Sequence, residues 1–120
     1  MAKHNTLGQK GEELAVDFLI KLGYTIVETN WHEKKFEIDI IARDNNELVF
    51  IEVKTRSTNY FGNPAEAVNL SKQKHLIEGA NYYLETNEID LDCRFDVVAI
   101  VKNNNEQKIE HIKDAFYPEA

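Results

Sequence analysis

The sequence is poor in cysteine and proline, with one cysteine, Cys93, and two prolines among 120 residues. A lone cysteine excludes an intramolecular disulfide and a multi-cysteine zinc site, and it suits a reducing compartment. No stretch approaches the roughly 18 apolar residues of a membrane span, and no apolar run follows the first five residues as a secretory signal requires. The sequence therefore predicts a cytoplasmic protein with no membrane partner.

Basic side chains are also scarce, since the formal net charge is −7. Proteins that bind nucleic acid by bulk electrostatics need lysine and arginine to neutralise phosphates, so a strongly basic binding domain is excluded. Most of the excess acid lies after residue 74, whereas residues 1–74 hold nearly equal numbers of acidic and basic side chains. A local basic face in the first two-thirds remains compatible with this distribution.

The residues that are present suffice for one hydrophobic core, so a single domain over residues 1–120 is expected. Thr6 and Gln9 have the spacing of a capping box, and Gly23 is a typical residue after a helix end. Hydrophobic periodicity and turn residues predict the other boundaries. The expected elements are a helix over 7–22, strands over 24–31, 36–43 and 47–56, a helix capped at Ser71 and running through Leu84, and strands over 93–101 and 109–116. The order αβββαββ predicts an α/β fold.

Two of these strands are expected to form a hairpin about Asn45 and Asn46, because asparagine tolerates positive φ. Asp44 then pairs with Glu47, and counting back along both strands places Asp39 directly across from Glu52. Side chains alternate between the two faces of a strand. One face is therefore expected to carry Glu37, Asp39, Glu52 and Lys54, with Glu37 across from Lys54, and the other Ile38, Ile40, Val49, Ile51 and Val53.

Asp39 and Glu52 are the candidate metal ligands. Opposed residues have Cβ atoms about 4.5–5.5 Å apart, where like charges are destabilising, so the pair needs a counter-charge. Lys54 can supply part of it, and Mg²⁺ typically takes one or two carboxylates and keeps several waters. The alternative for Glu52 and Lys54 is a structural salt bridge on a half-exposed strand. A slip of one residue in the register would move Asp39 to the other face.

Glu12 is a third candidate acid. On the first helix it lies beside the apolar stripe, whereas Glu13 points away from it. From that border a carboxylate could reach a site on the sheet. The alternative is a solvated acid in the first turn that complements the helix dipole.

An ordered set of motifs runs through most of the chain, from Gly8 to about Val101. The motifs are Gly8-x-x-Gly11-Glu12-x-x-Ala15, Gly23-Tyr24, Asn30-Trp31, Glu37-Ile-Asp39-Ile-Ile-Ala42, Val49-Phe-Ile-Glu52-Val-Lys54-Thr-Arg56, Lys72 and Arg94-Phe-Asp96. This set resembles the small uncharacterised YraN-like bacterial proteins. That family is similar to Holliday-junction resolvases and belongs to the PD-(D/E)xK nuclease superfamily.

The resemblance implies a restriction-endonuclease-like three-layer fold with a mixed β-sheet flanked by helices. It implies that Asp39 and Glu52 bind Mg²⁺ or Mn²⁺, that Lys54 is the catalytic lysine, and that Glu12 is a helix-borne acid near the metal. The sequence departs from the superfamily pattern in two places. Ile38 stands where the superfamily name has proline, which is usual in this branch, and Phe36 stands where glycine often precedes the glutamate. Neither departure removes a charged group.

Candidate contacts to nucleic acid are Lys72 and Gln73, at the start of the second helix, and Arg56, at the end of a strand. Helix N-termini bind phosphates well, and the resemblance favours Lys72 over Gln73. Solvated first-turn residues are the alternative. Tyr60 and Phe61 could stack on unpaired bases or fold back on the core.

Arg94 and Asp96 alternate with apolar residues in a buried strand. This pattern favours a structural ion pair that fixes the fold over a catalytic role.

Three functions fit these features. The first is Mg²⁺- or Mn²⁺-dependent hydrolysis of nucleic acid, with branched or single-stranded DNA as the expected partner. The second is a catalytically silent module that holds nucleic acid or recruits a partner, and the third is a protein–protein adaptor that uses the acidic C-terminal part. A homodimer is compatible with the small surface of an acidic chain of this size, although the sequence does not derive one.

Overall fold

The computed structural model describes residues 6–57 and 68–118. Its elements are α1 (Leu7–Lys21), β1 (Thr25–Glu33), β2 (Phe36–Asp44), β3 (Glu47–Arg56), α2 (Leu70–Thr86), β4 (Asp92–Lys102) and β5 (Gln107–Phe116). Within these residues the strands form one mixed sheet in the order β1-β2-β3-β4-β5. Only the β3–β4 pair is parallel among the described strands. The predicted α/β class and the order αβββαββ are confirmed.

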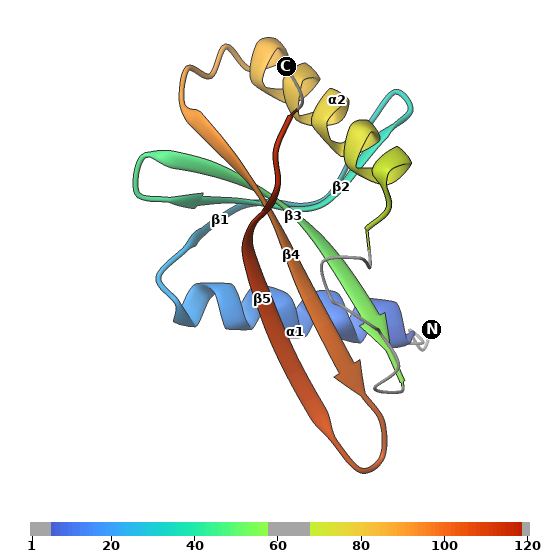
Figure 1. Cartoon of the computed structure of the whole chain (residues 1–120). Coiled ribbons are helices and arrows are strands. Elements are labelled where there is room, and N and C mark those ends of the chain that lie inside the picture. Colours follow the sequence, from blue (N-terminus) through green and yellow to red (C-terminus); the bar gives the residue numbers. More distant parts are fainter. Residues whose placement is uncertain (1–5, 58–67, 119–120) are drawn as a thin grey trace, which may run out of the picture.

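The two helices lie on opposite faces of the sheet, which gives three layers (Figure 1). Ala15 and Leu19 of α1 pack into one apolar cluster with Ile40, Val49 and Ile51. The second cluster joins α2 to the other face and contains Leu76, Ala80, Tyr83, Ile38, Ile41, Phe50 and Phe95. Neither described helix has the length and apolar character needed to cross a bilayer.

The helix ends follow from local capping chemistry. Thr6 and Gln9 form the predicted capping box of α1, and Gly23, with φ of 99°, follows its C-terminal end. The predicted cap of the second helix at Ser71 is wrong, because Asn69 is the N-cap and its side chain accepts the Lys72 backbone N–H. Leu70, which begins α2, is 76% exposed and so lies off the apolar stripe on which the prediction rested.

The hairpin has the predicted register, from Asp44 paired with Glu47 to Ile40 paired with Ile51. Asn45 takes the expected positive φ, 56°. Beyond Ile40, β2 and β3 no longer pair with each other. From there β2 continues along β1, and β3 continues along β4. The sheet therefore forks between β2 and β3, and the two strands diverge (Figure 1).

At the fork the alternation of side chains along β2 is broken. Ile38 packs in the cluster with α2, whereas Ile40 packs in the cluster with α1. The expectation that Ile38 and Ile40 share a face is therefore wrong. The break falls at Asp39 and at its neighbour on β1, Asn30, which has φ of 50°. A regular period of two cannot anticipate an irregularity that two adjacent strands share.

Candidate functional site

Asp39 lies where β2 and β3 separate. Its Oδ2 accepts a hydrogen bond from the Val53 backbone N–H at 2.9 Å. A side chain thus satisfies a backbone donor that the interrupted ladder leaves without a strand partner. The predicted direct pairing of Asp39 with Glu52 is wrong, because β2 and β3 pair only from Asp44–Glu47 to Ile40–Ile51. The fork nevertheless keeps the two carboxylates close together.

Glu52 is nearly buried, with 5% of its surface exposed. Burial first, and then the negative charge of Asp39, raise the pKa of its carboxyl to about 7, although Lys72 and Lys54 act in the opposite direction. Burial and a nearby like charge both penalise the ionised form. Glu52 is therefore a carboxylate that the fold holds in a site where additional positive charge would stabilise it.

Two lysines approach Glu52 from different layers. The Nζ of Lys54, two residues along β3, lies 3.9 Å from Oε2. The Nζ of Lys72, in the first turn of α2, lies 3.8 Å from the same oxygen. The structure therefore brings both predicted lysines to Glu52.

Glu37 does not join this group, so its predicted place across from Lys54 is wrong. The recorded pairing of β2 with β3 ends before these residues. Glu37 instead pairs with His32 on β1, with 3.3 Å between its Oε1 and the histidine Nε2.

Glu12 reaches the site because α1 lies unusually close to β3. A Cβ on Gly11 would collide with the Thr55 side chain, whose Cβ and Cγ2 would lie at 2.9 Å. Glycine at this position therefore permits the close approach of helix and strand. The pKa of Glu12 is raised, first by burial and then by the charge of Asp39, so the two carboxylates are near enough to repel each other. Glu13 is exposed.

The remaining predicted contacts lie around this group. Arg56 is exposed at the end of β3 and donates to the Thr55 carbonyl. Gln73 is half-buried, and its side-chain amide donates to the Val68 carbonyl. This hydrogen bond occupies the amide group that was predicted to contact nucleic acid. Tyr60 and Phe61 lie outside the described residues.

The acids at the fork suit a hard divalent cation. Within residues 6–57 and 68–118, no group of three or more histidine, cysteine, aspartate or glutamate side chains is gathered closely enough to enclose a metal. Mg²⁺ does not need such a group, because one or two carboxylates and several waters satisfy it. Asp39 and Glu52 supply two carboxylates. The raised pKa of Glu52 indicates that the nearby lysines do not fully compensate their negative charge. The residues present therefore fit Mg²⁺ or Mn²⁺.

Comparison with known proteins places the chain in a family. The profile described as "Uncharacterised protein family UPF0102" matches residues 11–100. The chain belongs to UPF0102. Its relatives include UPF0102 proteins of Flavobacterium psychrophilum, 52% identical over 117 residues, and Christiangramia forsetii, 50% identical over 117 residues. A UPF0102 protein of Bacteroides thetaiotaomicron is 47% identical over 118 residues, and each of these alignments covers 98% of both chains.

Asn30 of this UPF0102 chain lies at the site, although the sequence did not identify it as a candidate. Asn30 lies on β1 between the pairs that flank Asp39, and its side chain lowers the pKa of the Glu12 carboxyl. Its backbone carbonyl contacts Nδ1 of His32 at 2.9 Å. Asparagine adopts positive φ more often than most residues do. An asparagine within a strand-like run is therefore the signal that could have indicated this position.

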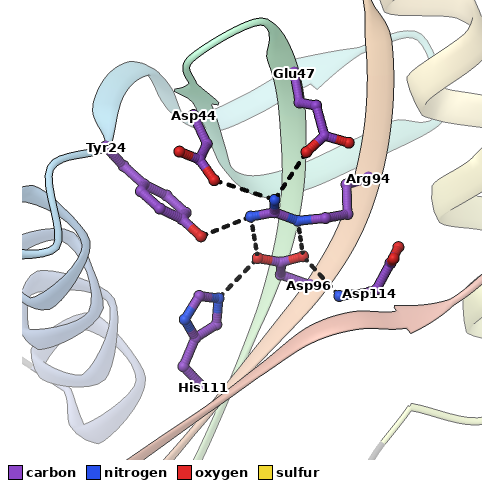
Figure 2. Close-up of polar contacts among 7 residues, drawn as sticks. All are labelled: Tyr24, Asp44, Glu47, Arg94, Asp96, His111 and Asp114. Atoms are coloured by element: carbon purple, nitrogen blue, oxygen red, sulfur yellow. Dashed lines mark hydrogen bonds and ion pairs between the residues drawn. The ribbon is translucent and has the colours of Figure 1, made fainter.

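A second buried polar group lies near the other end of β3 (Figure 2). Arg94 donates to both oxygens of Asp96, at 2.9 and 3.1 Å, and to Asp44 and Glu47 at 3.1 Å. It also donates to the Tyr24 hydroxyl at 2.6 Å. The predicted structural ion pair of Arg94 and Asp96 is confirmed.

Asp96 is fully buried and has two further partners. His111 on β5 contacts its Oδ2 at 2.7 Å, and the Asp114 backbone N–H donates to its Oδ1. Burial alone would raise the pKa of Asp96, but the hydrogen bonds from His111, Arg94 and Asp114 and the charge of Arg94 lower it. The sequence does not indicate this partner of His111, because neither residue type nor spacing distinguishes it from an ordinary polar side chain beside the apolar Ile112.

Proposed function

We propose that this UPF0102 chain is a Mg²⁺- or Mn²⁺-dependent endonuclease that hydrolyses phosphodiester bonds of DNA and acts in repair or recombination. One observation carries the proposal. Asp39 and the nearly buried Glu52 meet at the fork of the sheet, where the pKa of Glu52 is raised to about 7 and two lysines approach within 4.0 Å. Paired acids, a lysine and a nearby helix-borne acid are the groups that metal-assisted hydrolysis uses.

Each residue has a distinct proposed role. Asp39 and Glu52 would hold the divalent ion, and the Val53 N–H fixes the orientation of Asp39. A divalent ion bound there would polarise a phosphoryl oxygen and lower the pKa of a bound water. Lys54 orients the nucleophile or stabilises developing negative charge. Glu12 is the third acid, at the edge of the site beside Asn30, which lowers its pKa.

Sequence resemblance supports the same assignment. Asp39 and the run Glu52-Val53-Lys54 match the acidic and lysine positions of the PD-(D/E)xK pattern, and Glu12 matches a helix-borne acid of the resolvase-like branch. The described fold, a mixed sheet between two helices, is consistent with that superfamily. Fold alone does not establish activity, so the proposal rests on the site.

A catalytically silent nucleic-acid-binding or partner-recruiting module is the second candidate. Lys54 and Lys72 both lie near Glu52, and together they could neutralise the acids without a metal. Measurable affinity for DNA without metal-dependent turnover would favour this candidate.

Three further statements belong to the proposal. The substrate is DNA with branched or single-stranded character, the protein acts in the cytoplasm, and a homodimer would extend the surface available to a branched substrate. Arg56 and Lys72 contact phosphates beside the cut, and Gln73 does so only if its amide leaves the Val68 carbonyl.

The test is a cleavage assay with Mg²⁺ or Mn²⁺ on labelled single-stranded, duplex, flap and four-way-junction DNA. Asp39→Asn and Glu52→Gln are assayed beside wild type, with Glu13→Gln as the control because Glu13 is exposed on α1. Metal-dependent cleavage should fall at least about 100-fold in the two site variants and persist in the control. Equal cleavage by all four proteins, or none by wild type, would overturn the nuclease assignment.

A further inference from the structure

Next to the fork, partly buried aromatic rings form a continuous row across β1, β2 and α2. We call this row the aromatic ledge and define it as Trp31, Tyr82, Phe36 and His75. Their ring centroids are spaced 6.4 Å from Trp31 to Tyr82, 5.5 Å from Tyr82 to Phe36 and 5.5 Å from Phe36 to His75. All four residues retain exposed surface. The turn that joins β1 to β2 lies beside α2 (Figure 1).

The ledge is held in place by contacts between the turn and the helix. Nε2 of His75 lies 3.0 Å from the Lys35 carbonyl oxygen. Phe36 lies against Gly79, where an added Cβ would come within 3.3 Å of the Phe36 Cβ. Glycine in the middle of α2 therefore leaves room for this ring. The rings thus have a preformed arrangement that a ligand need not assemble.

Lysines accompany the rings. The Nζ of Lys34 lies 5.3 Å from the centre of the Tyr82 ring, and that of Lys35 lies 5.8 Å from the centre of Phe36. A hollow of about 580 Å³ at the start of α2 is lined by Lys72, Lys74 and His75, together with Asn69, Ser71 and Glu78. Lys72 connects this hollow to Glu52.

We propose that the aromatic ledge binds the unpaired bases of single-stranded DNA, while Lys34, Lys35 and the lysines of α2 contact its phosphates. Successive bases stack well on aromatic rings, and every base offers a π-face. The purpose of the ledge rests on the proposed nuclease function, because it leads a strand toward Glu52. Its binding, however, can be measured without cleavage.

The charge of the molecule favours a single strand over a duplex. The net charge is −7, and acidic Glu78 lines the same hollow as the lysines. Charge alone is therefore a weak source of affinity here, and stacking must supply most of it. Only unpaired bases can expose their faces to the ledge, because a duplex keeps them stacked inside.

Trp31 makes the test direct, since it is the only tryptophan of the chain. An oligothymidylate of about 12 nucleotides, a length within the range that single-strand sites cover, is titrated into the full chain in EDTA, which prevents metal-dependent cleavage. We expect saturable quenching of Trp31 fluorescence by the single strand and weaker binding of a duplex of equal length. Each phosphate neutralised contributes about −0.7 to the salt slope for single strands, so a shallow slope of about −1.5 to −3 is expected.

Variants identify the surface by fluorescence anisotropy of a labelled oligothymidylate. Tyr82→Leu should weaken binding about tenfold, Tyr82→Phe should retain it, and Lys34→Gln with Lys35→Gln should weaken it and reduce the salt slope. Lys21→Gln with Lys113→Gln is the matched control, because these lysines lie on α1 and β5 and both are exposed. Circular dichroism confirms that each variant is folded.

Unchanged Trp31 emission together with equal affinity in wild type, Tyr82→Leu and the lysine variant would overturn the ledge. So would a duplex that binds as tightly as the single strand. The two proposals fail in different ways. Ledge-dependent binding without metal-dependent cleavage would remove the nuclease and keep the ledge, whereas cleavage that needs Asp39 but ignores the ledge variants would do the reverse.

Discussion

At the scale of single residues, the surroundings of Glu52 disfavour its negative charge. The fold removes its carboxylate from water and sets Asp39 beside it, while the nearest cationic atoms lie at 3.8 and 3.9 Å. Buried charges are normally paired by closer, hydrogen-bonded partners. A group held in this way stores free energy that a bound cation can release, which is why the same feature supports the proposed metal site.

The metal-free protein should lose stability as this carboxyl ionises. Because the pKa of Glu52 in the folded protein, about 7, lies above the value of 4.5 usual for a glutamate, its contribution to stability is present below pH 4.5 and is lost as pH rises through 7. Glu52→Gln removes that loss. In EDTA, the free energy of unfolding of the variant relative to wild type should rise by roughly 2–3 kcal/mol between pH 4.5 and pH 8, measured in urea.

Glu13→Gln is the control for this measurement, since its carboxylate is exposed on the same molecule. Its stability should follow that of wild type across the pH range. Parallel curves for wild type and Glu52→Gln would show that the fold does not penalise the Glu52 charge.

Asn30 should tune the neighbouring acid Glu12. Asn30→Gly keeps a residue that tolerates φ of 50° but removes the side chain that lowers the pKa of Glu12, so this pKa should rise further. Asn30→Ala should do the same and also cost about 1–2 kcal/mol of stability from backbone strain. The Glu12 carboxyl resonance, followed by ¹³C NMR against pH, reports the shift. An unchanged titration in Asn30→Gly would show that the Asn30 side chain does not lower this pKa.

At the scale of elements, the hairpin explains what could be predicted and what could not. The register from Asp44 to Ile40 follows from two asparagines at the turn and the alternation of apolar residues, both of which are local signals. The fork beyond Ile40 is not local, because it depends on two strands breaking together at Asn30 and Asp39. The sequence therefore predicts which residues gather at the site. Their geometry depends on contacts between strands, which local sequence patterns do not specify.

The helix boundaries show the same division. The start of α1 is predictable because Thr6 and Gln9 satisfy each other's backbone groups within one turn. The start of α2 is less predictable, because Asn69 and Ser71 are both favourable N-caps. Leu70 is exposed, so the apolar pattern does not show that the helix begins there. Lys72 and its neighbours were still correctly assigned to the first turn.

Packing of α1 on β3 should depend on Gly11. Gly11→Ala forces a collision with Thr55 and is expected to lower the free energy of unfolding by about 1–3 kcal/mol. Adding Thr55→Ala should restore part of that loss, since it removes the colliding group. Gly8→Ala is the matched control, because its nearest contact would be the Thr6 hydroxyl at 3.9 Å, and it should stabilise the helix by up to about 1 kcal/mol. Equal effects of Gly8→Ala and Gly11→Ala in thermal unfolding would contradict the close approach.

At the scale of the whole molecule, the sheet is tied at one end of β3 and open at the other. Arg94 joins Tyr24, the β2–β3 hairpin and Asp96, and Asp96 in turn binds β5 through His111 (Figure 2). Every buried side-chain nitrogen and oxygen among the described residues has a hydrogen-bond partner. The tied end holds the strands together, while the fork brings Asp39, Glu52 and Lys54 together at the other end.

Breaking the tied end should destabilise the fold without touching the fork. Arg94→Met leaves Asp96 buried without its guanidinium, and such a loss typically costs about 3–5 kcal/mol. Arg43→Met is the matched control. Arg43 is exposed and donates a hydrogen bond to the nearby Asn45 carbonyl, so this variant should change stability by about 0.5 kcal/mol or less. Urea unfolding compares the two. A similar, small effect of both variants would mean that the network contributes little.

The most direct test of the metal site is the binding of Mn²⁺ itself, followed by electron paramagnetic resonance of the free ion at pH 8 in wild type, Asp39→Asn, Glu52→Gln and the control Glu13→Gln. A site formed by both carboxylates predicts saturable binding in wild type and the control, weakened at least about tenfold in each site variant. Equal binding in all four proteins, or none in wild type, would contradict a metal centre at the fork of the sheet.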